Sequence, residues 1–137
     1  MKFYSIIAVL ISVAFIAGGM DKTSEAAEKG KTSSIAKAKG GYTVEELFAK
    51  KDKLKGKKVA VRGKVAKISE GIMGRTWIHL QDGSGKQGTN DITVTTNQSA
   101  RVGDVVLITG NLITDKDFGA GYKYAVMIED ANVKVEK

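Results

Sequence analysis

The run Trp77-Ile78-His79-Leu80-Gln81 is the segment whose residue types and spacing could do ligand chemistry. Apolar and polar residues alternate with the period of two of a β-strand, so Ile78 and Leu80 share one face and the other three share the opposite face. An indole, an imidazole and a carboxamide on the outer face offer one ring for stacking and two hydrogen-bonding groups. The chemistry expected at this strand is ligand binding.

The rest of the chain predicts the elements that position this strand. Short apolar runs punctuated by glycine indicate five β-strands, expected at 57–68, 76–82, 91–96, 105–114 and 122–129, with 133–135 as a short extension. Thr43 and Glu46 form a capping box, which predicts a helix over 43–54 that ends at Gly56 and covers one open end of a barrel. Gly63 lies in the middle of the first strand, where a glycine is typical of a bulge or sharp bend. The chain therefore predicts an all-β fold, a five-stranded Greek-key barrel preceded by a short helix.

Only part of the chain belongs to this predicted domain. Lys2 is followed by a largely apolar run over 3–19, and the next charges are Asp21 and Lys22. This layout is typical of a secretory signal peptide over 1–19; an uncleaved anchor is the alternative, because the run is near the lower limit of about 17 residues for a bilayer span. Residues 20–41 are polar, which favours a flexible linker, and the domain is expected over 42–137. The protein is therefore expected to be exported to the periplasm or cell envelope.

The positive charge of the chain is concentrated before the barrel. The formal net charge is +7. Residues 20–58 contain 11 lysines and 6 acidic residues, whereas residues 59–137 contain 10 basic and 9 acidic residues, so the net charges are +5 and +1. A nearly neutral barrel weakens any argument for an anionic partner from the isoelectric point alone. The chain has no cysteine, which excludes disulfides, thiolate metal sites and cysteine nucleophiles.

Several phrases of the sequence resemble known families. With Gly63 in the first strand, WIHLQDGSG (77–85) and VGDVVLITGNL (102–112) resemble OB-fold nucleic-acid-binding domains of the anticodon-binding type. The segments 71–74 and 115–122 are also similar to a group of small exported bacterial proteins described as NrfJ-related or as DNA-binding proteins. The resemblance covers about residues 43–135 and implies an OB fold that binds nucleic acid.

The resemblance also implies where a ligand would bind. OB barrels bind on the face of strands two and three, between the loops that join strands one to two and four to five. In this chain those loops are expected at 69–75 and 115–121, and both are glycine-studded with exposed apolar residues, namely Ile72, Met73 and Phe118. The predicted ligand-binding residues are Arg62, Lys64, Arg75, Trp77, His79, Gln81, Lys116, Phe118, Tyr122 and Tyr124.

These residues predict a way to bind single-stranded nucleic acid. Trp77 and Phe118 would stack on bases, worth about 1–3 kcal/mol each. The phosphates would be contacted by the four basic residues of the set, Arg62, Lys64, Arg75 and Lys116. Four phosphate contacts to a single strand imply a salt slope of about −3. In the alternative, Trp77 packs under the 71–75 loop and Phe118 seals its hairpin. Both interpretations are open at this point.

Catalysis and cofactor binding find little support around His79. A lone histidine is more commonly a hydrogen-bonded surface residue than a ligand. Ser69, His79 and Asp82 could be drawn as a catalytic group, but no oxyanion-stabilising device accompanies them. The chain is therefore expected to be a non-enzymatic, monomeric binding module without a cofactor or metal. Single-stranded nucleic acid is the expected ligand; the alternative is a periplasmic glycan, small anion, haem, or partner protein in respiratory-protein maturation.

Overall fold

The structure is a computed structural model in which residues 34–137 are described. These residues form one compact unit, Ser34–Lys137. The predicted signal peptide or anchor, 1–19, and residues 20–33 of the predicted linker lie outside the described residues. None of the helices in the described part is long and apolar enough to cross a bilayer.

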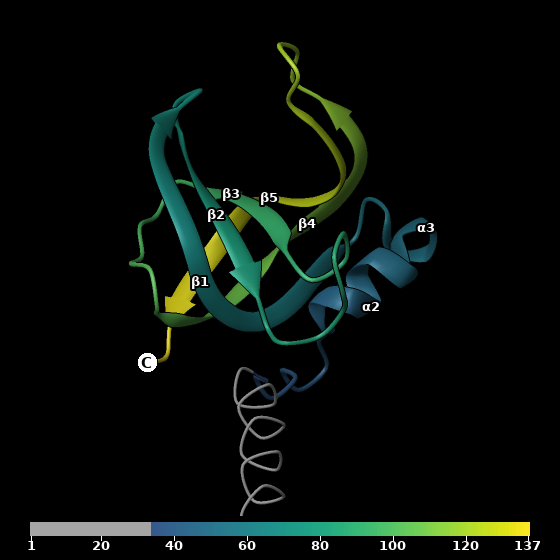
Figure 1. The fold of residues 1–137 in the computed structure, drawn as a ribbon, viewed down its shortest axis with the longest axis vertical. Coiled ribbons are helices and arrows are strands. Elements are labelled where there is room, and N and C mark those ends of the chain that lie inside the picture. Colours follow the sequence, from purple (N-terminus) through teal and green to yellow (C-terminus); the bar gives the residue numbers. More distant parts are fainter. Residues whose placement is uncertain (1–33) are drawn as a thin grey trace, which may run out of the picture. The chain divides into compact units, whose positions relative to one another are not determined.

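Five strands close into a barrel in the order β1-β2-β3-β5-β4, with β4 pairing back to β1 (Figure 1). The strands are β1 (Lys58–Ile72), β2 (Arg75–Gln81), β3 (Ile92–Thr96), β4 (Val105–Asp117) and β5 (Lys123–Val135). β3 and β5 are parallel, and every other neighbouring pair is antiparallel. The predicted all-β, five-stranded Greek-key barrel is confirmed.

Alternating apolar residues fill the interior of the barrel. Val61, Val65, Ile78, Leu80 and Ile108 are buried, and within each strand they recur with the period of two that turns alternate side chains to one face. Burying these branched side chains supplies the main favourable free energy of folding. The described residues contain no cysteine, so no disulfide adds to the stability of this barrel. The barrel is therefore a packed core, and any ligand site must lie on its outer surface.

The first strand curls around the barrel and pairs with two neighbours. β1 pairs with β4 over Lys58–Lys64 and with β2 from Lys64 onward. A Cβ at Gly63 would lie 2.7 Å from Leu80 Cγ, so the glycine allows the close approach that the bend requires. Of the bulge or sharp bend predicted at Gly63, the structure has the bend, since the register shifts between β1 and β2 fall later, between Val65 and Lys67 and between Ser69 and Ile72.

Two short helices, α2 (Val44–Ala49) and α3 (Lys51–Leu54), occupy the range predicted for one helix, 43–54. The capping box is present: Thr43 Oγ1 accepts from the Glu46 amide at 3.1 Å, and Glu46 Oε1 accepts from the Thr43 amide at 2.9 Å. The buried helix residues Val44, Leu47 and Leu54 belong to the barrel core. The helices thus close one end of the barrel.

The chain before α2 also lies against the barrel. The Ile35 amide donates to the Asp82 carbonyl oxygen at 2.9 Å, and the Asp82 carboxylate accepts from the Val44 amide at 2.9 Å. Arg62 Nη1 donates to the Ala36 carbonyl oxygen at 3.3 Å. The end of the predicted linker, 34–41, is therefore part of the domain, which begins before the predicted boundary at residue 42.

Two hairpins extend from the end of the barrel away from the helices (Figure 1). β1 and β2 pair as far as Ile72 and Arg75, so only Met73 and Gly74 form the turn. β4 and β5 pair as far as Asp117 and Lys123. The segment predicted as a loop at 69–75 is therefore mostly hairpin strand, because its backbone continues the ladder up to Ile72 and again from Arg75. Of the predicted loop at 115–121, residues 115–117 belong to β4, and residues 118–121 lie in the loop as predicted.

Candidate ligand site between two hairpins

Trp77 lies on the outer face of β2, as its parity predicts, but its indole is not free. It is 6% exposed and stands apart from the barrel core cluster. Trp77 Nε1 donates to the Ile72 carbonyl oxygen at 2.8 Å, and the Phe118 ring meets the indole edge-on at a centroid distance of 5.2 Å. Tyr124 lies at 5.9 Å from the indole. The structure therefore agrees with the alternative for Trp77, in which the indole packs under the 71–75 segment, and the indole has no free face for stacking on a base. Phe118 is half-buried, so its stacking role stays a prediction.

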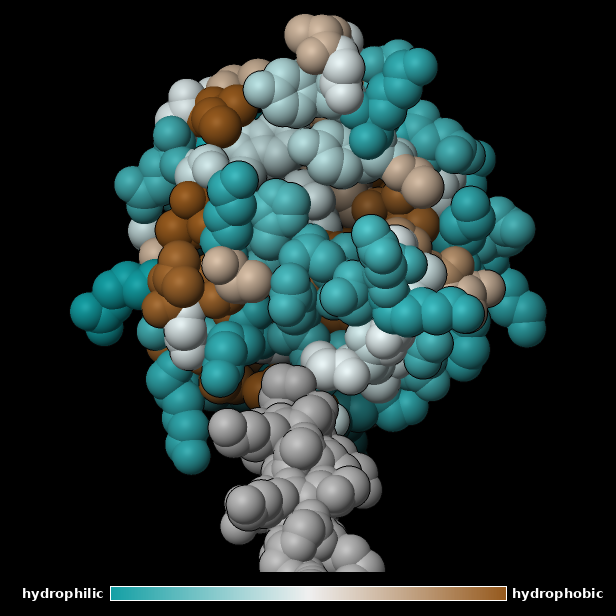
Figure 2. Space-filling view, viewed as in Figure 1, coloured by the Kyte–Doolittle hydropathy of each residue, from teal (hydrophilic) through white to brown (hydrophobic). Residues whose placement is uncertain are grey.

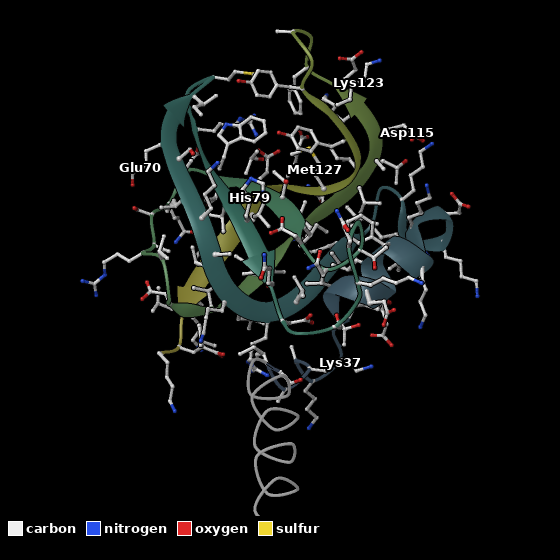
Figure 3. The ribbon with its side chains drawn as sticks, in the orientation of Figure 1. Lys37, Glu70, His79, Asp115, Lys123 and Met127 are labelled. Atoms are coloured by element: carbon white, nitrogen blue, oxygen red, sulfur yellow. The ribbon has the colours of Figure 1, made fainter. Side chains whose placement is uncertain are left out.

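His79 and Gln81 share the outer face with Trp77 and are both held by one carboxylate. His79 Nδ1 lies 2.8 Å from Asp91 Oδ1, and Gln81 Nε2 donates to Asp91 Oδ2 at 2.8 Å. A carboxylate accepts hydrogen bonds only, so Nδ1 is the protonated ring nitrogen. Both Asp91 oxygens are thereby engaged, and Nε2 is the ring nitrogen left for a ligand. Figure 3 shows the imidazole beside the aromatic side chains of the hairpins.

A pocket of about 190 Å³ opens between the hairpins over this face. It is lined by Lys67, Ser69, Ile72, Trp77, His79, Tyr122 and Tyr124. Burial raises the pKa of the Tyr124 phenol, with a smaller effect from Tyr122, so this hydroxyl stays neutral and can donate a hydrogen bond. The space is below the roughly 300–1,000 Å³ typical of drug-sized ligands, which limits it to about one ring system.

Both predicted arginines are already paired with carboxylates. Arg62 Nε donates to Glu136 Oε1 at 2.6 Å, which raises the pKa of the guanidinium and lowers that of the carboxyl. Arg75 Nη1 donates to Asp130 Oδ1 at 2.8 Å. Arg62 is far along β1 from the pocket, opposite Leu107 of β4. The structure therefore does not bring Arg62 to the candidate site, and it offers Arg75 only in an ion pair.

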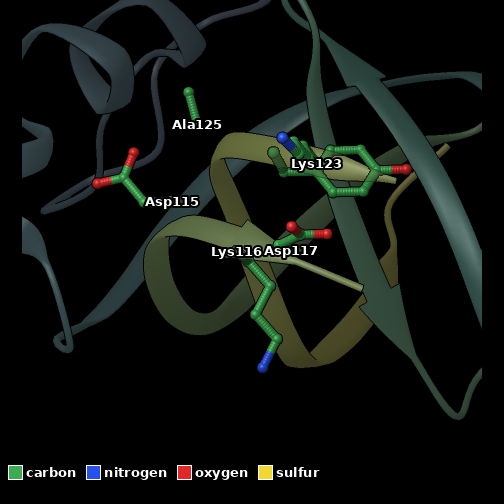
Figure 4. A pocket seen from close by; sticks show the side chains of 6 residues that line it. Asp115, Lys116, Asp117, Lys123 and Ala125 are labelled. Atoms are coloured by element: carbon green, nitrogen blue, oxygen red, sulfur yellow. The ribbon is translucent and has the colours of Figure 1, made fainter. Parts of the chain in front are cut away.

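The predicted lysines differ in position. Lys64 is exposed and lies opposite Gln81 on the outer face of β1 and β2. Lys116 Nζ lies 5.3 Å from the Phe118 ring centroid, a cation–π contact on the second hairpin. A larger hollow of about 410 Å³ lies along that hairpin, where Asp115 and Asp117 accompany Lys116 and Lys123 (Figure 4). Its lining comes from β4 and β5 alone, so the smaller pocket, which both hairpins and β2 line, is the better candidate for a site.

The tips of the hairpins expose apolar side chains. Ile72 is 37% exposed, Met73 50% and Tyr122 44%. Figure 2 shows a mostly hydrophilic face with hydrophobic side chains in several separate groups, a small one of them at the upper left. Within residues 34–137, no group of three or more His, Cys, Asp or Glu side chains is arranged to hold a metal ion. The surface chemistry of this end is aromatic and apolar with isolated charges.

Solved structures show which fold this barrel has. No protein-family model and no curated protein matches the chain. OBody AM2EP06, solved bound to hen egg-white lysozyme, matches with a TM-score of 0.53 and 18% identity, over 74% of this chain and 96% of that chain. OBody AM1L10, also bound to lysozyme, matches with a TM-score of 0.50 and 17% identity, over 75% and 99%. The domain is an OB fold.

The candidate site includes residues that the sequence did not predict to bind a ligand. Lys67 and Ser69 reach the pocket because the register shift after Val65 turns them onto the face of His79 and Trp77. Asp91, just before β3, orients His79 from across the sheet. Asp91 could have been suspected from the sequence, because it is a polar residue next to the start of a strand. Lys67 and Ser69 could not, because a register shift inside an alternating run leaves no pattern of its own.

Proposed function

We propose that this domain is an exported, non-enzymatic binding module that holds single-stranded nucleic acid on the outer face of β1 and β2. The observation that carries the proposal is the pocket between the hairpins, where Tyr122, Tyr124 and His79 surround a space for about one ring. OB folds bind oligonucleotides on this face, between these same connections. The apolar run over 3–19 supports export to the periplasm or cell envelope.

One unstacked base would occupy the pocket. Its ring would lie against the tyrosines, and its edge would meet His79 Nε2. When the imidazole is neutral, the Asp91 carboxylate keeps its proton on Nδ1 and leaves an acceptor at Nε2, which suits the exocyclic amino group of cytosine or adenine. Thymine has no amino group and would bind more weakly.

Phosphates would contact two lysines instead of the four basic residues expected from the sequence. Lys64 and Lys67 lie on the outer face of β1, and Lys67 lines the pocket. Two contacts to a single strand give a salt slope of about −1.4. Affinity should therefore fall only about sevenfold between roughly 50 and 200 mM salt.

A partner protein is the second candidate, because the hairpin tips expose Ile72, Met73 and Tyr122 together. Exposed apolar side chains gathered in one place favour protein contacts. The two OBody proteins of the same fold were solved bound to a protein, lysozyme.

Titration of the single tryptophan tests the proposal, since Trp77 lines the pocket. Oligo-dC and oligo-dA should change its fluorescence at low salt, and oligo-dT should do so less. Lys67→Gln should weaken binding several-fold and flatten the salt slope by about 0.7, whereas Lys86→Gln, an exposed lysine outside the pocket, should leave both unchanged.

Unchanged emission with every oligonucleotide at low salt, together with wild-type behaviour of Lys67→Gln, would refute nucleic-acid binding here. If a protein co-purifies with the wild-type domain and Met73→Asp abolishes that association, the partner-protein candidate is favoured. Salt-independent binding of glycan fragments would instead assign the pocket to a neutral ligand.

A further inference from the structure

Nearly all of the domain's net charge lies in one short segment. Residues 34–137 contain 18 basic and 12 acidic residues, a net charge of +6. Residues 50–58 alone carry +5, with Asp52 as their one acidic residue. We call the lysines of this segment the lysine face: Lys50, Lys51, Lys53, Lys55, Lys57 and Lys58. All except the half-buried Lys51 are exposed. The rest of the domain is therefore nearly neutral beside one short, exposed and strongly basic segment.

The lysine face is held in place by the fold. Leu54 anchors α3 in the barrel core. The Gly56 amide donates to the Leu112 carbonyl oxygen at 2.8 Å, and the Leu112 amide donates to the Lys57 carbonyl oxygen at 2.9 Å. The backbone that carries these lysines is thus hydrogen-bonded to β4, so the lysines stay close together in the folded domain.

The lysine face is not consumed by internal ion pairs. The ion pairs found within residues 34–137 join Lys37 to Glu46, Arg62 to Glu136, and Arg75 to Asp130, and the hydrogen bond between His79 and Asp91 becomes a further pair only when the imidazole is protonated. None includes a lysine from 50–58. The charge of this surface is therefore available to a partner.

The lysine face and the hairpin pocket lie at opposite ends of the domain. α2 and α3 lie at the end of the barrel away from the two hairpins (Figure 1). The chain enters the domain at this same end, because Lys37 Nζ lies 3.2 Å from Glu46 Oε1 on α2. A surface bound by the lysines would leave the hairpin pocket facing outward.

We infer that the lysine face docks the domain on an anionic phospholipid bilayer. Lysines near an anionic membrane surface attract it without any specific pocket, and the effect adds over neighbouring residues. The apolar run over 3–19 is expected to direct the chain to a membrane, as a signal peptide or as a retained anchor. A single nucleic-acid strand is the poorer fit, because residues 50–58 contain no aromatic ring on which bases could stack, and Lys50 Nζ already covers the neighbouring Tyr42 ring at 5.7 Å from its centroid. This inference is independent of what the hairpin pocket binds.

Site-specific labels on the full chain test the orientation. The chain has no cysteine, so Ala49→Cys beside the lysine face and Met73→Cys at a hairpin tip each give a single labelling site. In vesicles that contain phosphatidylglycerol and a quencher attached to lipid headgroups, the label at 49 should be quenched more than the label at 73. In phosphatidylcholine vesicles the two should be quenched alike.

Matched charge variants separate docking from net charge. Lys53→Gln, Lys55→Gln and Lys57→Gln together should shift the docking equilibrium about a hundredfold, at about fivefold per lysine, and so abolish the extra quenching at 49. Arg101→Gln, Lys123→Gln and Lys134→Gln remove the same charge elsewhere and should preserve it. Equal quenching of both labels in anionic vesicles, or equal effects of the two triple variants, would overturn the inference. Protection of the label at 49 by an oligonucleotide and not by vesicles would overturn it in favour of nucleic acid.

Discussion

Replacing Trp77 by alanine should separate the stability of the hairpins from that of the barrel. The indole is 6% exposed and contacts Phe118 and Tyr124 of the opposite hairpin, with its Nε1 bonded to the Ile72 carbonyl oxygen. Removing a buried tryptophan side chain costs about 3–5 kcal/mol where the surroundings stay rigid. The hairpins can partly close the gap because they project from the barrel, so we expect about 3 kcal/mol, at the lower end of that range. Trp77→Phe keeps a ring but loses the hydrogen bond, and should cost about 1–2 kcal/mol.

Urea unfolding followed by far-ultraviolet circular dichroism measures both variants, since neither retains tryptophan fluorescence. Amide hydrogen exchange should then show faster opening for residues 69–75 and 115–124 in Trp77→Ala, with the barrel strands near Ile78 and Ile108 little changed. A cost below about 1 kcal/mol for Trp77→Ala would refute the packing described between the hairpins. Uniform acceleration of exchange over the whole barrel would show that the indole supports the barrel core and not the hairpins.

Three further variants test the bend of β1 at Gly63, the hydrogen bond from the Val44 amide to Asp82, and the ion pair between Arg62 and Glu136. Gly63→Ala should destabilise the domain by about 1–3 kcal/mol in urea unfolding, because its Cβ would meet Leu80; no loss would mean that the corner is looser than described. Asp82→Asn should cost about 1–3 kcal/mol in the free energy of unfolding and speed amide exchange at the start of α2. If the new NH₂ group takes the place of Oδ2, the Val44 amide faces a donor and loses its acceptor. The Arg62 hydrogen bond lowers the pKa of Glu136, so this pair stabilises the fold above the ordinary glutamate pKa and the contribution is lost as the pH falls through the folded-state value. Glu136→Gln should therefore flatten the acid side of the profile of thermal midpoint against pH, and an unchanged profile would contradict the pair.

The barrel could be predicted from the sequence because its information is local. Alternation in Trp77–Gln81 and the glycines between apolar runs specify strand faces and ends, and Thr43 with Glu46 specifies where the helix begins. The hairpins were harder to predict. Segments 69–75 and 115–121 are rich in glycine and polar residues, which is typical of loops. Cross-strand pairing, a non-local effect, nevertheless makes most of the first segment and residues 115–117 of the second into strand.

The candidate site could be predicted only in outline for a related reason. Parity fixed which face carries Trp77, His79 and Gln81, but exposure depends on what lies across from them. Phe118 covers the indole from a hairpin distant in sequence, and Asp91 engages both polar side chains. A sequence pattern predicts which face of a strand a side chain lies on. The residues that it contacts on that face are determined by the tertiary structure.

The separation of pocket and lysine face makes ionic strength a way to distinguish the two ends of the domain. At about 0.1 M salt the Debye length is roughly 10 Å, so charges on one end contribute little to a ligand bound at the other. Binding at the hairpin pocket involves two lysines and should respond weakly to salt, whereas contact through residues 50–58 involves several and should respond steeply. A shallow slope for oligonucleotides beside a steep one for anionic vesicles would assign each partner to its own end. Steep slopes for both would mean that nucleic acid uses the lysine face, and the pocket would then need a different ligand.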